Sequence, residues 1–519
     1  MQAKTSFAKA VATVGGWTVV SRVLGFVRDV VIARTLGAGP VADAFFIAFR
    51  LPNFFRQLFG EGAFNSAFVP LFTKELTEKG KAEAREFAEQ AMSLLGSILL
   101  FVAILGEIFI VLVVTAMAIG FKDDIRFDLA VNFSRITFPY VFFICLAALY
   151  SGVLNAMGRF AAAAATPVLL NLTTIAAAFG LTPFLGSAGY ALSWGILLAG
   201  IIQLAWLIHS AKQVDMRLRL RWPRFTPAMR QLLRRMVPGV LGSGIVQINL
   251  LIGTQLATLL PIGAVSYIYY ADRLNQLPMA VIATAIGTAL LPLMSRQISN
   301  GEPEAAITSQ NRACEMALAL TLAAAVGLLF LATPIVQVLY ERGEFGAVET
   351  GATAATLMGF VVGLPAYGLI KVFTPAFFAR GDTRTPVRVA IVSMVTNIAL
   401  NLILMHYLAQ VGIALATALA AWINVVVLVV ILYRRRFFHF DSLSRRRIPL
   451  LVVGGLLEAL VLWLLWHYAE VRFEASGLML RIVYLAGMIG LGAGVYFAFV
   501  IGTGAFARDG IVRILRRRG

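Results

Sequence analysis

Long apolar stretches dominate this sequence of 519 residues and restrict its possible folds more than any other feature. A helix needs about 20 consecutive apolar residues to cross the hydrocarbon core of a bilayer. Fourteen stretches meet that length, so the sequence predicts an all-α polytopic membrane protein with about 14 transmembrane helices. The predicted spans are residues 8–36, 41–60, 84–119, 127–157, 160–181, 187–211, 228–258, 262–296, 306–339, 347–379, 385–406, 411–433, 447–468 and 478–504.

The composition agrees with a membrane protein and argues against an enzyme. Hydrophobic residues make up 60% of the chain and charged residues 13%, whereas soluble domains have about 25% charged residues. No phosphate-binding G-x-x-x-x-G-K-[ST] motif and no nucleophile–base pair stands out. Cys145 and Cys314 both fall in apolar stretches, without the spacing of a metal site. We therefore predict a protein that is not an enzyme and holds neither cofactor nor metal.

The net charge of +18 has a topological explanation. Lysine and arginine gather in alternate loops, and loops rich in these residues usually face the cytoplasm. This pattern predicts that both termini are cytoplasmic. The basic loop 212–235 and the tail Arg516–Arg518 are expected to lie on anionic phospholipids rather than on nucleic acid.

The chain repeats part of its own sequence. Residues 36–84 resemble residues 259–306, and Pro70-Leu71-Phe72 in the first copy matches Pro292-Leu293-Met294 in the second. A repeat with an even number of spans keeps its orientation, which predicts two six-helix lobes related by a pseudo-twofold axis along the membrane normal. The predicted organisation is a first lobe, a second lobe that begins with the basic linker, and a C-terminal helix pair with a basic tail, at residues 1–211, 212–433 and 434–519.

Cationic side chains lie deep within several predicted spans. An arginine at mid-bilayer costs about 3 kcal/mol on insertion scales and more in simulations, so such residues are usually functional. One interpretation is that each cation pairs with a nearby acid and has a structural role. The cations outnumber the acids, however, so we expect residual positive charge that needs water or an anion. The cations are Arg22, Arg28, Arg50, Arg56, Arg273 and Lys371; the acids are Asp29, Asp43, Glu61 and Asp272.

This excess of cations predicts a chamber within the bundle that takes an anionic cargo. Guanidinium groups suit phosphate, because their planar fork makes paired, charge-assisted hydrogen bonds. In the second predicted span a polar stripe adds Asn53 to the charged residues. The candidate substrate-binding residues are Arg22, Arg28, Asp43, Arg50, Asn53, Arg56, Glu61, Asp272, Arg273 and Lys371.

Five motifs resemble the MurJ (MviN) lipid II flippase family, within the multidrug/oligosaccharidyl-lipid/polysaccharide exporter superfamily. They read SRVLGFVRD, ADAFF, LPNFFR, EGAF and YYADRL, at residues 21–29, 42–46, 51–56, 61–64 and 269–274. The resemblance implies a V-shaped pair of six-helix lobes around a central cationic cavity. It also implies that the last two helices help to form a groove for the undecaprenyl tail.

The same resemblance assigns roles to individual residues. It implies that Arg22, Arg28 and Arg273 hold the diphosphate and the headgroup. Arg56 and Asp43 match residues that the family needs, and Glu61 and Lys371 also occupy matching positions. The chain departs from some relatives at Gln57, where those relatives carry a second arginine after the one that matches Arg56.

These observations predict a bacterial inner-membrane flippase. Its expected substrate is lipid II, carried from the cytoplasmic to the periplasmic leaflet by alternating access, and the cell-wall synthesis machinery is a possible partner. Two alternatives remain open. One is a flippase for another polyprenyl-diphosphate-linked saccharide, which shares the diphosphate. The other is an ion-coupled multidrug exporter, which the sign of the charge disfavours because organic cations prefer acidic cavities.

Overall fold

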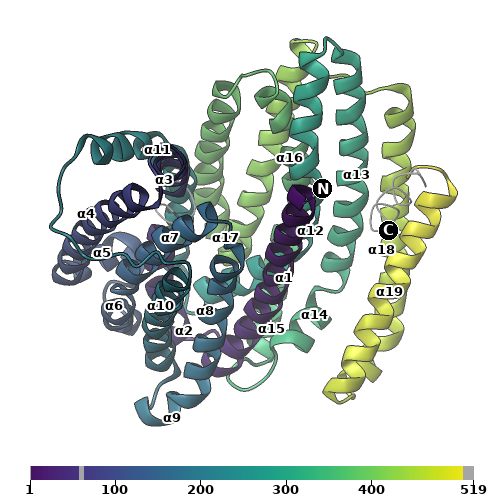
Figure 1. The fold of residues 1–519 in the computed structure, drawn as a ribbon. Helices are drawn as coiled ribbons and strands as arrows, with labels where there is room; N and C mark the ends of the chain where they lie inside the picture. The colour runs from purple at the N-terminus through teal and green to yellow at the C-terminus, as the bar shows by residue number, and fades with distance from the viewer. Residues whose placement is uncertain (1, 58–63, 507–519) are drawn as a thin grey trace. The chain divides into compact units, whose positions relative to one another are not determined.

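The structure, a computed structural model, describes residues 2–57 and 64–506, without the side chains at 2–12, 238–249, 281–285 and 288. The described residues form helices and no strand, which confirms the all-α prediction (Figure 1). The helices are α1 (Gln2–Leu36), α2 (Pro40–Phe55), α3 (Phe64–Glu78), α4 (Lys81–Ile108), α5 (Ile110–Met117), η2 (Ile119–Phe121), α6 (Ile125–Thr137), α7 (Tyr140–Ala156), α8 (Phe160–Gly180), α9 (Thr182–Leu185), α10 (Ala188–Gln213), α11 (Pro227–Thr258), α12 (Ala264–Ser299), α13 (Pro303–Phe330), α14 (Ala332–Tyr340), α15 (Ala347–Val361), α16 (Leu364–Phe378), α17 (Arg384–Arg434), α18 (Ser442–Glu474) and α19 (Leu478–Gly502).

Within the described ranges, nine helical stretches are long and apolar enough to cross a membrane. One of them, α17, covers two predicted spans, 385–406 and 411–433. Ala409 breaks its helical geometry with φ 47° and ψ −128°, between those two spans. A Cβ at Gly412 would lie 2.3 Å from the carbonyl oxygen of Leu404, so the chain turns back closely on itself there. The total of fourteen spans stays a prediction. Helix α3, by contrast, lies in a stretch where no span was predicted.

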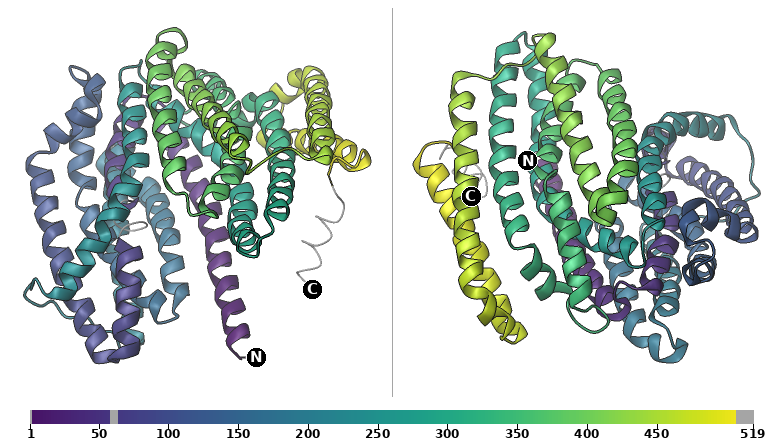
Figure 2. Two further views of the ribbon diagram at one scale, coloured as in Figure 1. Left: turned by 90° about the horizontal axis from the view of Figure 1, so that it is seen from above. Right: turned by 180° about the vertical axis from the view of Figure 1, so that it is seen from behind.

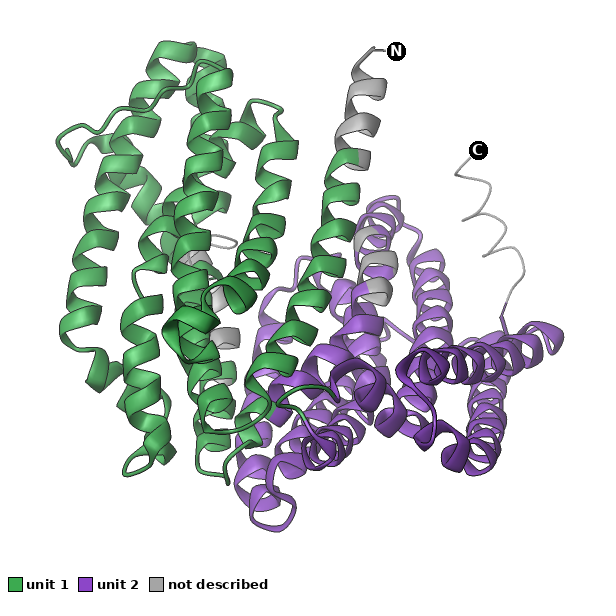
Figure 3. Ribbon diagram, turned by 90° about the horizontal axis from the view of Figure 1, so that it is seen from below, with its two compact units in different colours: residues 1–266, 342–345 green, residues 267–341, 346–519 purple. Residues whose placement is uncertain are grey.

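The chain forms two compact units (Figure 3). Unit 1 comprises residues 1–266 and 342–345, and unit 2 comprises residues 267–341 and 346–519. In unit 1, α8 packs on α1 and α10, α10 also packs on α7, and α2 packs on α6. Helix α11 belongs to this unit through its contacts with α3, α5 and η2.

Unit 2 is organised around α13, which packs on α16 on one side and on α18 on the other. Large aromatic residues such as Phe373 and Phe377 of α16 fill the first interface, together with residues of α12 and α17. A smaller core joins α13, α18 and α19, and includes Leu451 and Tyr496. Figure 2 shows α18 and α19 side by side along much of their length. The C-terminal pair therefore attaches to unit 2 through α13.

A tight contact within unit 1 joins the α1–α2 turn to residues 342–345. The amide of Glu344 donates a hydrogen bond of 3.0 Å to the carbonyl oxygen of Arg34. Gly37 has φ +63°, and a Cβ there would lie 2.3 Å from the carbonyl oxygen of Glu344. Gly343 has φ +62° and would place a Cβ 2.3 Å from the carbonyl oxygen of Arg34. Both glycines are thus required by backbone conformation and by the close approach of two segments.

We expect Gly37→Ala to lower the free energy of unfolding by about 2 kcal/mol or more, since a left-handed non-glycine residue alone costs about 1–2 kcal/mol. The added methyl group must also push the two segments apart. Thermal unfolding of the purified protein measures the effect. Gly39→Ala is the matched control, because Gly39 has φ −98° and open space around it. Equal melting temperatures for the two variants would contradict the prediction.

Candidate functional site

The two arginines of α1 differ in their surroundings. Arg22 is exposed, and no group in the described part of the chain pairs with it. Arg28 is 7% exposed; its Nη2 lies 2.8 Å from Asp29 Oδ1, and its Nη1 donates to Asn171 Oδ1 at 3.1 Å. Asn171 in turn donates from Nδ2 to the carbonyl oxygen of Ser21 at 3.0 Å. The charge of Arg28 is therefore balanced locally, whereas Arg22 is exposed.

Gly25 explains how α8 comes so close to α1. A Cβ at Gly25 would lie 3.4 Å from Asn171 Nδ2, so the missing side chain makes room for the asparagine amide. That amide then bridges the backbone at Ser21 and the guanidinium group of Arg28. The sequence places Gly25 between two arginines, but nothing in it indicates that an asparagine from another helix fills this space.

Asp43 of α2 is fully buried and accepts hydrogen bonds from the α11–α12 connection. Its Oδ1 accepts from the amide and the hydroxyl of Ser266 at 3.0 and 2.6 Å, and its Oδ2 accepts from the amide of Gly263 at 2.8 Å. Arg126 Nη1 lies 3.4 Å from Oδ2. Asp43 has 0% exposure, so no substrate can reach it in this conformation. It anchors the segment through which the chain leaves unit 1.

Arg126 completes this anchor, and the sequence analysis did not single it out. Its Nε donates to Asp124 Oδ2 at 2.8 Å, and its guanidinium carbon lies 4.3 Å from the centre of the Phe121 ring. In the sequence, Arg126 reads as a loop cation offset by the acids beside it. One signal was present: Asp124 precedes a helix and caps its first turn by accepting from the Arg126 amide.

The other candidates on α2 and after it are only partly buried. Arg56 donates from Nε to Asn53 Oδ1 at 2.9 Å. Arg50 is half-buried. Glu61 lies outside the described residues. The structure thus brings Arg56 and Asn53 together.

Three candidates lie in unit 2. Arg273 of α12 donates from Nη2 to the Tyr269 hydroxyl at 3.2 Å, and its guanidinium carbon lies 4.9 Å from the centre of that ring. Asp272 accepts from the amide of Gln276. Lys371 of α16 is exposed and has no hydrogen-bond or ion-pair partner among the described residues.

The basic loop after α10 forms an extended strap, residues 214–226, along the first turns of α4. Glu89 of α4 accepts from the amide of Arg219 at 3.0 Å and from the guanidinium group of Arg221. A hydrogen bond from Lys81, with further support from Arg85, holds the pKa of Asp215 below its ordinary value. Trp222 stays 84% exposed. The strap thus presents an aromatic side chain and several arginines outward.

We expect Glu89→Ala to release this strap, because Glu89 is 2% exposed and provides two of its charge-assisted contacts. Hydrogen bonds to charged groups contribute about 1.5–3 kcal/mol each, so trypsin should cut between Arg217 and Arg224 about tenfold faster or more. Glu83→Ala is the control, since Glu83 lies exposed on the same helix. Equal cleavage rates in the two variants would show that Glu89 does not hold the strap.

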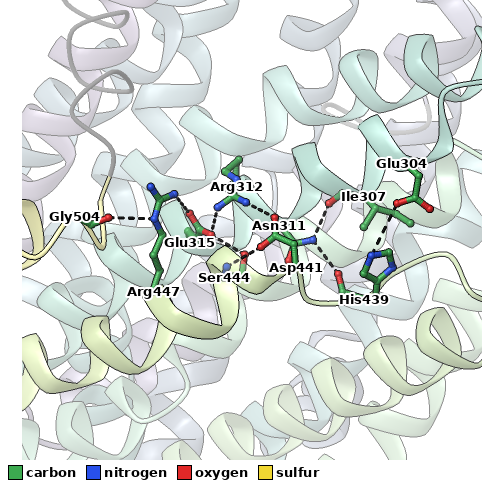
Figure 4. Close-up of polar contacts among 10 residues, drawn as sticks. All are labelled: Glu304, Ile307, Asn311, Arg312, Glu315, His439, Asp441, Ser444, Arg447 and Gly504. Atoms are coloured by element: carbon green, nitrogen blue, oxygen red, sulfur yellow. Dashed lines mark hydrogen bonds and ion pairs between the residues drawn. The ribbon is translucent and has the colours of Figure 1, made fainter.

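A second polar cluster, also missed from the sequence, joins α13 to α18 (Figure 4). Glu315 accepts from Ser444 Oγ at 2.6 Å and from Arg447 Nη1 at 2.9 Å. Arg312 bridges Glu315 and Asp441. Arg312 and Glu315 lie three residues apart in a predicted helix, and this spacing was the one sign of the cluster in the sequence. Their partners on α18 and just before it lie 129 or more positions away along the chain.

The sequence was compared with models of protein families and with known proteins. The family model described as "Lipid II flippase MurJ" matches residues 32–484. Two relatives named "Probable lipid II flippase MurJ" are each 42% identical to this chain. The one from Rhizobium tropici aligns over 96% of this chain and 95% of its own length. The one from Rhizobium meliloti (strain 1021) aligns over 99% and 97%, respectively.

The fold also matches solved structures of transporters. The structure described as "Lipid II flippase MurJ, inward closed conformation" matches with a TM-score of 0.76 and 27% identity, over 94% of this chain and 99% of that one. An inward-facing multidrug resistance MATE family transporter of the MOP superfamily matches with a TM-score of 0.66 over 80% of this chain and 94% of that one; at 16% identity it shows the fold alone. Because the family model and the relatives span most of the sequence, the chain belongs to the lipid II flippase MurJ family.

Proposed function

We propose that this chain moves lipid II, an undecaprenyl-diphosphate-linked peptidoglycan precursor, from the cytoplasmic to the periplasmic leaflet of a bacterial inner membrane. The match to the lipid II flippase family over residues 32–484 carries this proposal. Exposed or half-buried cations within the helices support it, because a lipid diphosphate is anionic and favours arginine forks. The cations are Arg22, Arg50, Arg273 and Lys371.

The proposed mechanism is alternating access. The lobes at residues 1–211 and 212–433 rock about the membrane midplane, and the headgroup enters a cationic central cavity from the cytoplasmic leaflet. Without cargo, repulsion among the cations disfavours the occluded state. The diphosphate removes that repulsion and so favours closure, which gives the differential affinity that a ligand-driven change requires. The C-terminal helices, within residues 434–519, hold the lipid tail in a groove.

The local partners of the arginines refine this proposal. Arg28 is balanced by Asp29, so it contributes shape and hydrogen-bond donors more than net charge. Arg22 is exposed and pairs with no group in the described part of the chain. We therefore infer that Arg22 contributes net positive charge to the field that the diphosphate meets.

The proposed setting is a membrane with both termini in the cytoplasm. Strap residues 214–226 then lie at the cytoplasmic surface, where Trp222 suits the interface and the arginines suit anionic phospholipid headgroups. A lipid II flippase supplies substrate to cell-wall synthesis, so enzymes of that machinery are the proposed partners. The proposed activity moves the substrate and alters none of its covalent bonds.

The experiment is transport by the full chain reconstituted in vesicles. Lipid II is supplied in the inner leaflet, and its arrival in the outer leaflet is followed by accessibility to an added enzyme. We expect transport that excess undecaprenyl diphosphate inhibits and an organic cation does not. Inhibition by the organic cation alone would instead indicate a multidrug exporter.

Rescue of a cell depleted of its own lipid II flippase distinguishes the possible lipid cargoes. We expect expression of this chain to restore growth and cell shape. A chain that transports another polyprenyl-diphosphate saccharide in vesicles, and fails to rescue these cells, would contradict the lipid II assignment while leaving the diphosphate site intact.

A further inference from the structure

An acidic residue lies at the centre of the apolar part of α18. Residues 448–466 contain one charged side chain, Glu458. The helix runs from Ser442 to Glu474, which places Glu458 midway along it. A carboxyl group at this depth is costly unless it is paired or neutral, so its surroundings decide its chemical state.

Glu458 faces the interior of the packing between α13, α18 and α19. It is 2% exposed and lies on the buried face of α18, one turn from Gly454 and Gly455 and one turn from Leu462. A Cβ at Gly327 of α13 would lie 4.0 Å from Glu458 Oε1. On the α19 side, a Cβ at Gly454 would lie 3.3 Å from Tyr496 Cδ2, and one at Gly492 would lie 2.7 Å from Leu462 Cδ2. The carboxyl group thus lies against α13, on a face of α18 that also packs against α19.

The polar cluster at the start of α18 prevents Glu458 from turning toward lipid. Arg447 and Ser444 both bond to Glu315 of α13, and Arg447 Nε also donates to the carbonyl oxygen of Gly504 at 3.1 Å (Figure 4). These contacts fix the rotation of α18 about its axis. Glu458 lies about three turns, or roughly 16 Å, further along the helix than Arg447.

No cation reaches Glu458 from the helices packed against α18. Residues 316–340, which include most of α13, and residues 482–506, which include most of α19, contain no charged side chain. Tyr496 of α19 packs near this part of α18, since a Cβ at Gly454, one turn before Glu458, would lie 3.3 Å from its Cδ2. Glu458 Oε2 and Tyr496 Oη are both buried, and neither has a hydrogen-bond partner among the described residues.

We propose that Glu458 is a proton-binding site within the membrane, held as a neutral carboxylic acid. A bound proton removes the negative charge, so that no ion is buried among these helices without a counter-charge. Loss of that proton introduces an unpaired charge between α13, α18 and α19 and loosens the attachment of the C-terminal pair to α13. This inference does not rest on the proposed transport activity.

Infrared difference spectroscopy on the full-length protein in lipid nanodiscs tests the proposal. At neutral pH, subtracting the spectrum of Glu458→Gln from that of the wild type should reveal the carbonyl stretch of one protonated carboxylic acid per chain. Glu470→Gln is the matched control: Glu470 is exposed on the same helix, so its subtraction should reveal an ionised carboxylate instead.

The infrared spectra distinguish a protonated Glu458 from an ionised one. An ionised carboxylate band for Glu458 at neutral pH would overturn the proton site. If Glu458→Gln does not fold, a pH titration of wild-type protein labelled with ¹³C in its glutamate carboxyl groups gives the same answer. A carbonyl band of a protonated carboxylic acid that is present at neutral pH in the wild type and in Glu470→Gln supports the proposal. The absence of this band from the wild type at neutral pH contradicts it.

Discussion

Replacing Asp43 with alanine should lower the free energy of unfolding by about 4 kcal/mol, in the range observed when one partner of a buried ion pair is removed. The change leaves the amides of Gly263 and Ser266 and the hydroxyl of Ser266 without their acceptor in a fully buried site. Arg126 loses one carboxylate but keeps Asp124. Three orphaned donors dominate the loss, because each buried donor without a partner costs about 1–3 kcal/mol.

Thermal unfolding of the purified protein, together with the amount recovered from membranes, measures the effect. Asp43→Asn should cost about half as much, since its amide oxygen can still accept from Ser266 while its NH₂ group meets the amide of Gly263. Ser266→Ala should cost about 1 kcal/mol, because it removes one hydroxyl and no acceptor. This graded series is the signature of a structural anchor.

The same series tests the prediction that Asp43 binds substrate. A residue that acts on cargo alone would lose transport in Asp43→Asn without loss of stability. An anchor instead loses transport in proportion to stability, and a second stabilising change elsewhere recovers both. Unchanged stability in Asp43→Ala would contradict the anchor and favour direct contact with substrate in another conformation.

The sequence predicted the helices well because their formation depends on apolar length. The break at Ala409 lies between two spans that were predicted from hydropathy and loop composition. Residues 64–78 were harder to predict, because α3 mixes aromatic residues with lysine and glutamate and lacks a long apolar run. The number of membrane crossings depends on how each helix lies in the bilayer. The length of an apolar stretch alone does not determine this.

The sequence allows the candidate residues to be counted, but it does not show which other residues they contact. A surplus of arginine over acid can be counted along a chain, and the assignment to the flippase family confirms what the motifs indicated. The partners depend on tertiary contacts: Asn171 reaches Arg28 from 143 positions away, and Ser266 reaches Asp43 from 223. Helical periodicity predicts the face of the helix on which a residue lies. It does not predict which residue of another helix will contact it.

Arg22→Ala and Arg273→Ala should each slow transport of lipid II by about 10- to 100-fold while the protein remains folded. A hydrogen bond between charged groups contributes about 1.5–3 kcal/mol, and 1.4 kcal/mol corresponds to a factor of ten. Arg22 is exposed, so its removal leaves no buried partner behind. The measurements are the initial rate of transport in vesicles and the melting temperature of each variant.

Arg28→Ala should behave differently, and this difference is the sharper test. The change removes the guanidinium group that pairs with Asp29, which is 4% exposed, so stability should fall together with transport. The double variant Arg28→Ala/Asp29→Ala should recover stability and still transport slowly, because the donors for the diphosphate are missing. Lys74→Ala is the control for charge alone, since Lys74 is exposed beside Glu78. Wild-type rates in Arg22→Ala, Arg273→Ala and the double variant would rule out these three arginines as the site of the diphosphate, because each variant would have lost a guanidinium group at no cost to transport.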